Sequence, residues 1–283
     1  MDLEPLQSLT MSESERLLFG TFIEREFGIK MPANKKSLLE GRLGKRLRAC
    51  GISSFRDYFN FVTKDQQGQD EFLTFIDLIT THETSFFREN KHFRYLAEVV
   101  LPRYAQTRIS KPISVLSAAC STGEEVYSLA MVFHHYFEQT NQTGILWNIE
   151  GIDISERVVT IARRGVYTGD RIKNLGSSWL ERYLMVSKDR SRNLFRIVPE
   201  LRQSTKFSSG NLLEKGGLPN THYDIIFCRN VMIYFDKDTQ YKVLSSLVEH
   251  LLPRGLIFLG HSESFIFSEL PLVAVSHAVF QRV

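Results

Sequence analysis

The chain has 283 residues, 43% of them hydrophobic and 24% charged, with a formal net charge of +3 at pH 7. These proportions are typical of a soluble globular protein with one large domain and a smaller companion, and the charge is too small to indicate nucleic-acid binding. The cysteines, Cys50, Cys120 and Cys228, form no C-x-x-C pair, which disfavours a zinc module or a disulfide framework.

The N-terminus has neither a basic n-region nor an apolar h-region, so we expect no signal peptide. No window approaches the ~20 uninterrupted apolar residues of a membrane span. We therefore expect a cytoplasmic protein without membrane insertion.

Helical patterns dominate the first 80 residues. Ser12 and Glu15 form a capping box, which marks the start of a first helix. Gly51 suits the end of a second helix, because glycine readily adopts the left-handed conformation found there. Apolar residues recur at helical spacing in four segments, namely Leu18–Phe27, Leu39–Leu47, Phe55–Val62 and Phe72–Ile79. We predict an N-terminal helical domain over residues 1–80 and a linker over residues 81–90.

Strands and helices alternate in the remaining residues, 91–283. A helix is predicted from Phe93 to Val100, ended by Pro102. The apolar strand candidates and the helices between them are Ile113–Leu116, Glu124–Glu138, Trp147–Ile152, Glu156–Arg164, Lys206–Ser208, Tyr223–Cys228, Asp238–Leu252 and Leu256–Gly260. This alternation predicts an α/β fold with a doubly wound, mostly parallel sheet.

One stretch interrupts this alternation. Asn193–Val198 alternates apolar and polar residues after the polar run Ser187–Arg192, which is typical of a short strand outside the main sheet. We predict a small antiparallel β subdomain over residues 178–205.

The first strand-to-helix turn, Ala118–Gly123, has the small residues that let a ligand approach the backbone. It is not the G-x-G-x-x-G of a dinucleotide fold, and Glu124 and Glu125 at the helix start would repel a phosphate. A cationic ligand suits these carboxylates better, and S-adenosylmethionine carries a sulfonium and an ammonium group. Alternatively, either glutamate simply stabilises the helix start through the helix dipole.

Asp153 ends the second predicted strand. An acid at this point of an open α/β sheet typically accepts hydrogen bonds from ribose hydroxyl groups. Alone, such an aspartate could instead cap the following helix. Together with the first turn, it indicates a site for a nucleoside cofactor.

Several motifs, in order along the chain, resemble the chemotaxis receptor methyltransferase (CheR) family. They are Thr84–Glu89, Ser117–Tyr127, Phe207–Leu213, Phe227–Phe235 and Gly260–Glu263. The resemblance covers nearly the whole chain and implies a class I methyltransferase fold with an N-terminal helical domain. It also implies S-adenosylmethionine as methyl donor, S-adenosylhomocysteine as product, and glutamate side chains of cytoplasmic chemoreceptor helices as acceptors, in chemotaxis adaptation.

The same resemblance implies which residues bind the cofactor. Glu125 would hold its amino group and Asp153 its ribose, while Asn211 and Leu212 would border the adenine. His82 departs from the family, in which many relatives have asparagine, but histidine can also donate or accept a hydrogen bond. The implied cofactor-binding set is His82, Thr84, Arg88, Glu125, Asp153, Asn211, Leu212, Arg229 and Asn230.

Arg88 and Tyr234 are the predicted catalytic residues. A glutamate carboxylate, with a reference pKa of about 4.3, is ionised at neutral pH, so its methylation needs no general base. The step is an in-line displacement at the methyl carbon, accelerated by alignment and exclusion of water. Arg88 would orient the incoming carboxylate and Tyr234 would hold it by a hydrogen bond. Alternatively, Arg88 is a salt-bridged structural arginine and Tyr234 a core aromatic residue.

No metal site is predicted. His134 and His135 are adjacent on a helix and therefore point in different directions. Cys120 and Cys228 have no plausible histidine partner and are interpreted as small packing residues. His261 follows a strand and either approaches the substrate or stabilises a turn.

The second helix has a broad basic face formed by Arg42, Lys45, Arg46 and Arg48. Such a face is usually just solvated, but an acidic receptor helix would give it a partner through charge complementarity. In the resembling family, the N-terminal domain contacts the methylated receptor helices. Nucleic acid is not an expected partner, and nothing demands more than a monomer.

In some relatives, the β subdomain captures a peptide at the receptor C-terminus by strand addition. Those relatives have glycines in the loop before the strand, whereas this chain has Ser187–Asn193. We therefore expect direct docking without such a tether.

Two other classes of function fit parts of the pattern. A non-catalytic module that binds S-adenosylmethionine would be expected to have lost at least one of Arg88, Asp153, Asn230 and Tyr234. A nicotinamide-dependent dehydrogenase would need the glycines that the first turn lacks.

Overall fold

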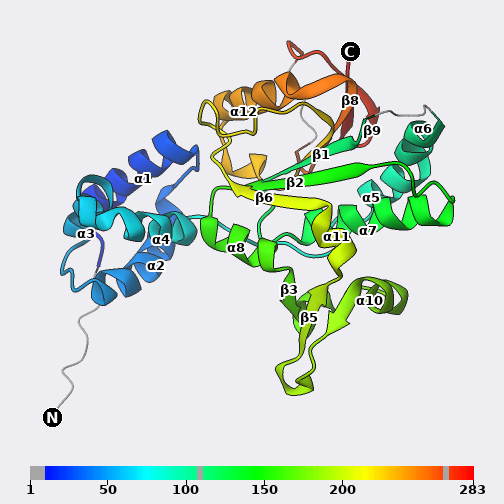
Figure 1. The fold of residues 1–283 in the computed structure, drawn as a ribbon. Coiled ribbons are helices and arrows are strands. Elements are labelled where there is room, and N and C mark those ends of the chain that lie inside the picture. Colours follow the sequence, from blue (N-terminus) through cyan, green and yellow to red (C-terminus); the bar gives the residue numbers. More distant parts are fainter. Residues whose placement is uncertain (1–9, 107–110, 264–267) are drawn as a thin grey trace. The chain divides into compact units, whose positions relative to one another are not determined.

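The computed structural model describes residues 10–106, 111–263 and 268–283. The chain forms two compact units (Figure 1). The first contains Met1–Thr81 together with Tyr234–Asp236, and the second contains His82–Ile233 and Lys237–Val283. From His82 onward, the predicted linker over residues 81–90 is part of the second unit.

The first unit is helical, as predicted. Its capping box is present, because Ser12 Oγ accepts a bond from Glu15 N at 3.2 Å and Ser12 N donates to Glu15 Oε2 at 2.8 Å. Gly51 has the left-handed backbone expected after the second helix, with a φ of 68°. The helices are α1 (Glu13–Phe27), η1 (Ala33–Lys35), α2 (Lys36–Ala49), α3 (Phe55–Lys64), η2 (Gln66–Gly68) and α4 (Gln69–Ile79).

A partly buried ion pair joins α2 to α4, with Glu71 buried and Arg46 partly exposed. Both carboxylate oxygens of Glu71 accept from Arg46, Oε1 from Nε at 2.9 Å and Oε2 from Nη2 at 2.6 Å. The hydroxyl of Tyr58, which is fully buried on α3, donates to Glu71 Oε1 at 2.7 Å. Arg42 donates to the carbonyl oxygens of Leu78 and Thr80 at the end of α4.

These contacts correct one prediction. Two of the four cations assigned to the basic face of α2, Arg42 and Arg46, are engaged inside the helical unit, because the carboxylate of Glu71 and carbonyl groups at the C-terminal end of α4 accept their hydrogen bonds. Lys45 and Arg48 are exposed. The basic face is therefore smaller than the helical pattern indicated.

The second unit is built on a seven-stranded sheet with the order β6-β2-β1-β7-β8-β10-β9. The first five strands in this order run parallel, and β10 and β9 add an antiparallel edge. Figure 1 shows α7 and α12 on opposite faces of the sheet. The strands are β1 (Ile113–Ala118), β2 (Trp147–Asp153), β6 (Thr205–Ser209), β7 (Tyr223–Cys228), β8 (Leu251–Leu259), β9 (Leu272–Ser276) and β10 (Val279–Arg282). The predicted doubly wound, mostly parallel sheet is confirmed.

In the helices of this unit, the chain does not leave the helical conformation at Pro102, where a helix end was predicted. The chain passes from α5 through the π-helical segment η3 into α6, and Pro102 is the second residue of α6, where a missing N–H is tolerated. A helix end at Pro102 was therefore wrong. The helices are α5 (Lys91–Tyr95), η3 (Leu96–Val100), α6 (Leu101–Gln106), α7 (Glu124–Gln139), α8 (Glu156–Arg164), α9 (Gly169–Ile172), α10 (Ser177–Tyr183), η4 (Arg190–Arg192), α11 (Pro199–Gln203) and α12 (Lys237–Glu249). The short helix η5 (Met232–Tyr234) begins in this unit, but its last residue, Tyr234, is assigned to the first.

The small antiparallel sheet has the order β3-β5-β4, with β3 at Val166–Thr168, β4 at Leu184–Val186 and β5 at Leu194–Ile197. The strand predicted at Asn193–Val198 is β5. The range 178–205 starts too late, because β3 lies before it. Three residues are too few to show a strand periodicity in the sequence.

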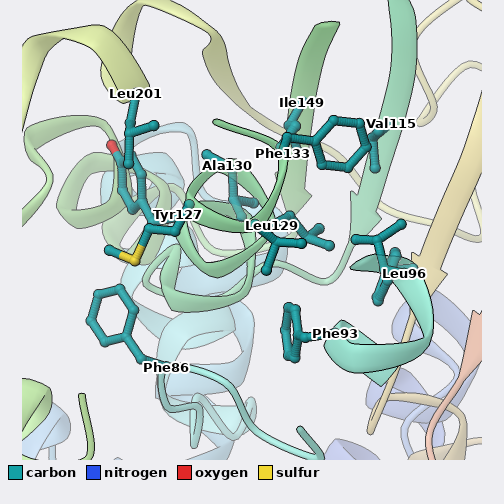
Figure 2. Packing of buried hydrophobic residues seen from close by; sticks show 14 of the residues in the cluster. Phe86, Phe93, Leu96, Val115, Tyr127, Leu129, Ala130, Phe133, Ile149 and Leu201 are labelled. Atoms are coloured by element: carbon teal, nitrogen blue, oxygen red, sulfur yellow. The ribbon is translucent and has the colours of Figure 1, made fainter. Parts of the chain in front are cut away.

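Packing of α7 against β1 and β2 forms the centre of the core (Figure 2). Leu129 and Phe133 on α7 are completely buried, as is Val115 on β1. Gly151 on β2 permits this close packing, since a Cβ there would lie 2.8 Å from Val126 Cγ2 and 3.0 Å from Cys120 Sγ. The core thus brings the start of α7 close to the carboxyl ends of β1 and β2.

No helix in the described ranges combines the length and the apolar character needed to span a bilayer.

Replacing Gly68 by alanine should destabilise the helical unit. The new Cβ would lie 1.9 Å from the carbonyl oxygen of Phe61, so the backbone must move, and we expect a loss of about 1–3 kcal/mol in the free energy of unfolding. Urea denaturation measures this loss. Gly41→Ala on α2 is the matched control: its Cβ meets nothing within 4 Å, so it should stabilise by about 0.5–1 kcal/mol. Equal stability of the two variants would contradict the close contact at Gly68.

Candidate functional site

The three segments singled out in the sequence meet at one edge of the sheet. Strand β1 lies between β2 and β7, with Ser117 opposite Gly151 on one side and Phe227 on the other. The strand order reverses at β1, and ligands of open α/β sheets bind outside the carboxyl ends of the strands at such a point. The first turn, Asp153 and the segment after Cys228 are therefore neighbours.

The first turn has an unusual backbone. Ala119, Ser121 and Gly123 all have positive φ angles, of 66°, 48° and 93°. Only glycine adopts this conformation without strain, so the two other residues are held in it by their surroundings. At Gly123, the start of α7, a Cβ would also lie 2.8 Å from Ala162 Cβ. The result is a tight loop whose backbone a ligand can approach.

Asp153 is one of the groups that hold this turn. It is 7% exposed, and its carboxylate accepts from Ser121 N at 2.8 Å and from Ser155 N at 3.0 Å. Burial raises the pKa of Asp153, against the opposing effect of these backbone hydrogen bonds. The N-cap of α8 is Ser155, whose Oγ accepts from Val158 N, so capping is not the role of Asp153.

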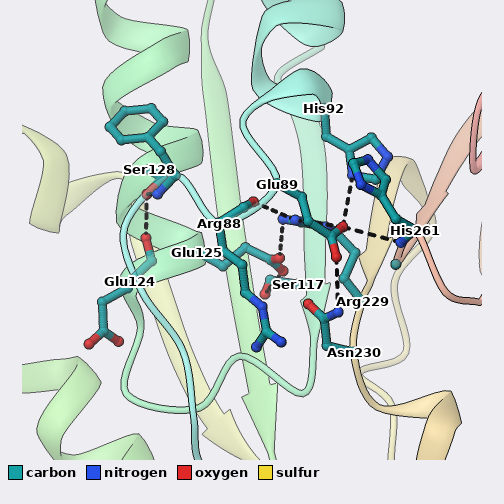
Figure 3. A network of polar contacts seen from close by, with 12 residues as sticks. Arg88, Glu89, His92, Ser117, Glu124, Glu125, Ser128, Arg229, Asn230 and His261 are labelled. Atoms are coloured by element: carbon teal, nitrogen blue, oxygen red, sulfur yellow. Dashed lines mark hydrogen bonds and ion pairs between the residues drawn. The ribbon is translucent and has the colours of Figure 1, made fainter. Parts of the chain in front are cut away.

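The two glutamates at the start of α7 differ in their surroundings. Glu124 is completely buried and forms an ion pair with Arg171, with a further hydrogen bond from Thr122 Oγ1 at 2.6 Å. Its carboxylate is therefore part of the core. Glu125 accepts from Ser117 Oγ at 2.8 Å and from Arg229 Nη1 at 2.9 Å (Figure 3).

Arg229 lies between two carboxylates. Its side chain is 1% exposed, and Nη1 bonds to Glu125 while Nη2 bonds to Glu89 Oε2 at 3.0 Å and to the carbonyl oxygen of Arg88. The guanidinium carbon also lies 5.5 Å from the ring centroid of Phe93. Because a buried cation requires paired charges, this bridge ties the segment after β7 to α7 and to the predicted linker.

Sequence reasoning missed the role of Glu89. Besides the contact with Arg229, Glu89 accepts from Asn230 Nδ2 at 3.0 Å and from His261 N at 3.3 Å (Figure 3). Burial alone would raise the pKa of Glu89, but the bond from Asn230 and the charge of Arg229 outweigh it and hold the pKa below its ordinary value. The only signal in the sequence was its position directly after Arg88 in a quoted motif.

Arg88 lies between two residues with positive φ, Phe87 at 54° and Glu89 at 55°. Its Nη1 donates to the carbonyl oxygen of Glu83 at 2.9 Å. Figure 3 shows its side chain pointing away from that of Glu89. Arg88 is partly exposed, and its guanidinium is not part of the Arg229 bridge.

Other predicted cofactor contacts surround Asp153. The carbonyl oxygen of His82 accepts from Ser121 Oγ at 2.9 Å, and Gly210 N donates to the carbonyl oxygen of Asp153 at 2.9 Å. Asn211 is buried, and its Oδ1 accepts from Leu213 N at 3.1 Å, which orders the loop after β6.

The remaining predicted residues are Thr84 and Leu212, both half-buried in the second unit, and Tyr234. Tyr234 belongs to the helical unit, where its carbonyl oxygen accepts from Lys30 N at 3.1 Å and Lys35 Nζ lies 5.8 Å from its ring centroid. The predicted catalytic pair of Arg88 and Tyr234 is thus divided between the two units.

One cluster has the composition of a metal site. Ligand atoms of Glu89, His92 and His261 all lie within 4.8 Å of one another. However, both oxygens of Glu89 already accept hydrogen bonds, and a cation bound there would lie beside the guanidinium of Arg229. The cluster therefore gives no reason to add an ion, and the absence of a metal remains a prediction.

A mostly parallel seven-stranded sheet of this order, with an acidic helix start after β1 and an acid at the end of β2, defines a class I S-adenosylmethionine-dependent methyltransferase. Residues 82–276 match the family described as "CheR methyltransferase, SAM binding domain", and residues 16–80 match "CheR methyltransferase, all-alpha domain". The chain belongs to the CheR methyltransferase family, and its cofactor is S-adenosylmethionine.

Proteins named chemotaxis protein methyltransferase are similar over most of the chain. Those of Salmonella typhimurium and Escherichia coli are 38% and 36% identical over 263 residues, which is 93% of this chain and 88% of each relative. That of Borreliella burgdorferi is 35% identical over 260 residues, or 91% of this chain and 89% of the relative. A solved plantazolicin methyltransferase, BpumL with SAH, covers 79% of this chain and 61% of its own at 16% identity and a TM-score of 0.32, which adds no argument.

His92 should make the protein sensitive to acid. Its side chain is buried, and burial, together with the charges of Arg229 and His261, lowers its pKa from 6.5 to about 4. Between these values the unfolded chain binds more protons, so stability should fall as the pH falls from about 6.5 to 4, by about 3 kcal/mol in total.

Urea unfolding at several pH values tests this expectation. In His92→Phe, the fall in the free energy of unfolding between pH 6.5 and 4 should be about 3 kcal/mol smaller than in the intact protein. His222→Gln, at an exposed position, is the control and should show the same fall as the intact protein. The same pH dependence in His92→Phe and in the intact protein would show that His92 is not held neutral.

Proposed function

We propose that the protein transfers the methyl group of S-adenosylmethionine to glutamate side-chain carboxylates on the cytoplasmic helices of chemoreceptors. The products are glutamyl methyl esters and S-adenosylhomocysteine, and the role is adaptation in chemotaxis. The observation that carries this proposal is the similarity, over 93% of the chain, to proteins named chemotaxis protein methyltransferase. A cytoplasmic location, a monomeric state and the absence of a nucleic-acid partner are parts of the same proposal.

The proposed cofactor-binding roles are those that membership of the family implies, and the contacts of Asp153 and Glu125 support them. Asp153 accepts the ribose hydroxyls, and Asn211 and Leu212 border the adenine. Glu125 attracts the cationic amino group of the cofactor, with Arg229 fixing the orientation of its carboxylate. Asn230, with His82 and Thr84 from the linker, completes the contacts.

Bound there, S-adenosylmethionine supplies a methyl group on a cationic sulfur. The acceptor carboxylate is already ionised at neutral pH, so the protein has no proton to remove. The guanidinium of Arg88, a partly exposed residue, attracts and orients this carboxylate, and the hydroxyl of Tyr234 donates a hydrogen bond to it. Alignment of the reacting groups can contribute about 7–11 kcal/mol, so most of the acceleration comes from positioning.

Asp153→Ala should weaken the micromolar-range binding of S-adenosylhomocysteine by about tenfold or more, measured by titration calorimetry. Because Asp153 also holds the strained turn, the loss could arise from a displaced Ser121 and not from the ribose. A 2′,3′-dideoxy analogue separates these causes: the intact protein should bind it about tenfold or more weakly, whereas Asp153→Ala should not discriminate. No binding by the intact protein would overturn the proposal.

The reaction itself is tested with tritium-labelled S-adenosylmethionine and a chemoreceptor cytoplasmic fragment. Label that alkali releases as volatile methanol identifies a methyl ester, since N-methyl groups resist this treatment. Cofactor binding without any label transfer would instead favour the non-catalytic signalling module.

We further propose that the exposed cations of α2 contact the acidic receptor helix. Arg42 and Arg46 are bound within the helical unit, which leaves Lys45 and Arg48 to supply the complementary charge. The β subdomain is not needed as a peptide tether in this scheme.

The double variant Lys45→Glu/Arg48→Glu should raise the KM for the receptor fragment about three- to tenfold, because charges at the rim of an interface mainly affect the rate of association. The Kd for S-adenosylhomocysteine should remain unchanged. The effect should diminish at high salt. Lys242→Glu, at an exposed position on α12, is the control and should leave both constants unchanged. An unaltered receptor KM in the double variant would exclude α2 as the docking surface.

A further inference from the structure

The Gly260–Glu263 motif after β8 has no role in the proposed chemistry, yet it binds the segment that follows β7. Glu263 is completely buried, and its carboxylate accepts three backbone N–H groups. Oε2 accepts from Asn230 at 2.7 Å and from Gly260 at 2.9 Å, and Oε1 accepts from Ile233 at 3.2 Å. Two of these donors belong to the segment 229–233, which carries the predicted cofactor contacts Arg229 and Asn230.

Asn230 is held from two sides. Its backbone has a φ of 59°, a left-handed conformation that asparagine tolerates better than most residues. Glu263 binds its backbone N–H, and Glu89 binds its side-chain amide at 3.0 Å. The direction of the Asn230 side chain therefore depends on two carboxylates that come from different ends of the second unit.

Gly260 makes room for this arrangement. A Cβ at Gly260 would lie 2.5 Å from Glu263 Oε2 and 3.0 Å from both the backbone nitrogen and Nδ2 of Asn230. Any side chain there would intrude between the carboxylate and the segment that it binds. The absence of a side chain at Gly260 therefore allows Glu263 to bind the segment 229–233.

The ionised form of Glu263 is the one that can accept all three bonds. Burial raises the pKa of Glu263, while the bonds from Asn230, Gly260 and Ile233 oppose that rise. A glutamine has only one acceptor oxygen, and its amide nitrogen would face a backbone N–H. Replacing Glu263 by glutamine should therefore release part of the segment 229–233.

We propose that Glu263 is a positioning residue of the cofactor site: through the backbone of segment 229–233 it orients Asn230, and so sets the affinity for S-adenosylmethionine without contacting it. This inference rests on the proposed role of Asn230 in cofactor binding. Since Tyr234 follows Ile233 directly in the chain, the same bonds also fix the point from which the segment bearing Tyr234 starts.

Two variants test the positioning role of Glu263, with S-adenosylhomocysteine as the ligand in titration calorimetry. Glu263→Gln and Gly260→Ala should each raise the Kd about tenfold or more while circular dichroism remains native. Asp224→Asn is the matched control, because its carboxylate also accepts a backbone N–H, from Ser114 at 2.9 Å, but at the opposite end of β7. It should lose stability and keep the Kd of the intact protein.

A double-mutant cycle distinguishes positioning from general destabilisation. If Glu263 acts through Asn230, Asn230→Ala/Glu263→Gln should bind no more weakly than Asn230→Ala, whereas independent effects would add. Additive losses, or a Kd within twofold of the intact protein in folded Glu263→Gln, would overturn the proposal. If Glu263→Gln does not fold, the same cycle with Gly260→Ala decides. Absence of binding by the intact protein would mean failure of the proposed function and is thus a separate outcome.

Discussion

The guanidinium of Arg229 lies in the interior between two carboxylates that are distant in the sequence, and the geometry of the site depends on this bridge. Glu89 supplies one charge from the segment before α5, and Glu125 supplies the other from the first turn of α7. A buried ion pair that loses one partner costs about 3–5 kcal/mol, because the remaining charge is uncompensated. The bridge therefore couples the three segments strongly, although its net contribution to stability need not be large.

Charge is distributed around this bridge in a way that suits the cofactor. Two carboxylates share one guanidinium, so the cluster of these three side chains has an excess negative charge. Glu124, by contrast, is completely buried and is neutralised by Arg171, so it is not available to a ligand. The acidic start of α7 thus divides into one residue paired with Arg171 and one that takes part in the Arg229 bridge.

Much of the fold could be predicted, because local patterns determine it. Apolar runs separated by amphipathic helices indicated the parallel strands, and the order of turns placed Asp153 beside the first turn. The roles of Glu89 and Glu263 could not be predicted in this way. Their partners are 141 and 33 residues away in the sequence, and hydrophobic periodicity contains no information on which distant backbone group a carboxylate will bind.

The wrong predictions have a related cause. The basic face of α2 was inferred from one helix alone, but α4 contributes Glu71, which pairs with Arg46 and neutralises its charge. Pro102 was taken as a helix end, although the helix path changes at the π-helical segment before it and resumes as α6. In both cases the helix itself was predicted correctly, and the error came from an adjacent element that the local pattern did not reveal.

The grouping of Tyr234–Asp236 with the N-terminal helices has a consequence for the construction of chimeras. A compact unit made of two separate stretches of chain cannot be exchanged between relatives by a single crossover. A recombinant that takes its first 81 residues from one parent and the remainder from another combines helices and a tripeptide that did not evolve together. Transplantation of the complete helical unit therefore calls for two exchanges, one of them only three residues long.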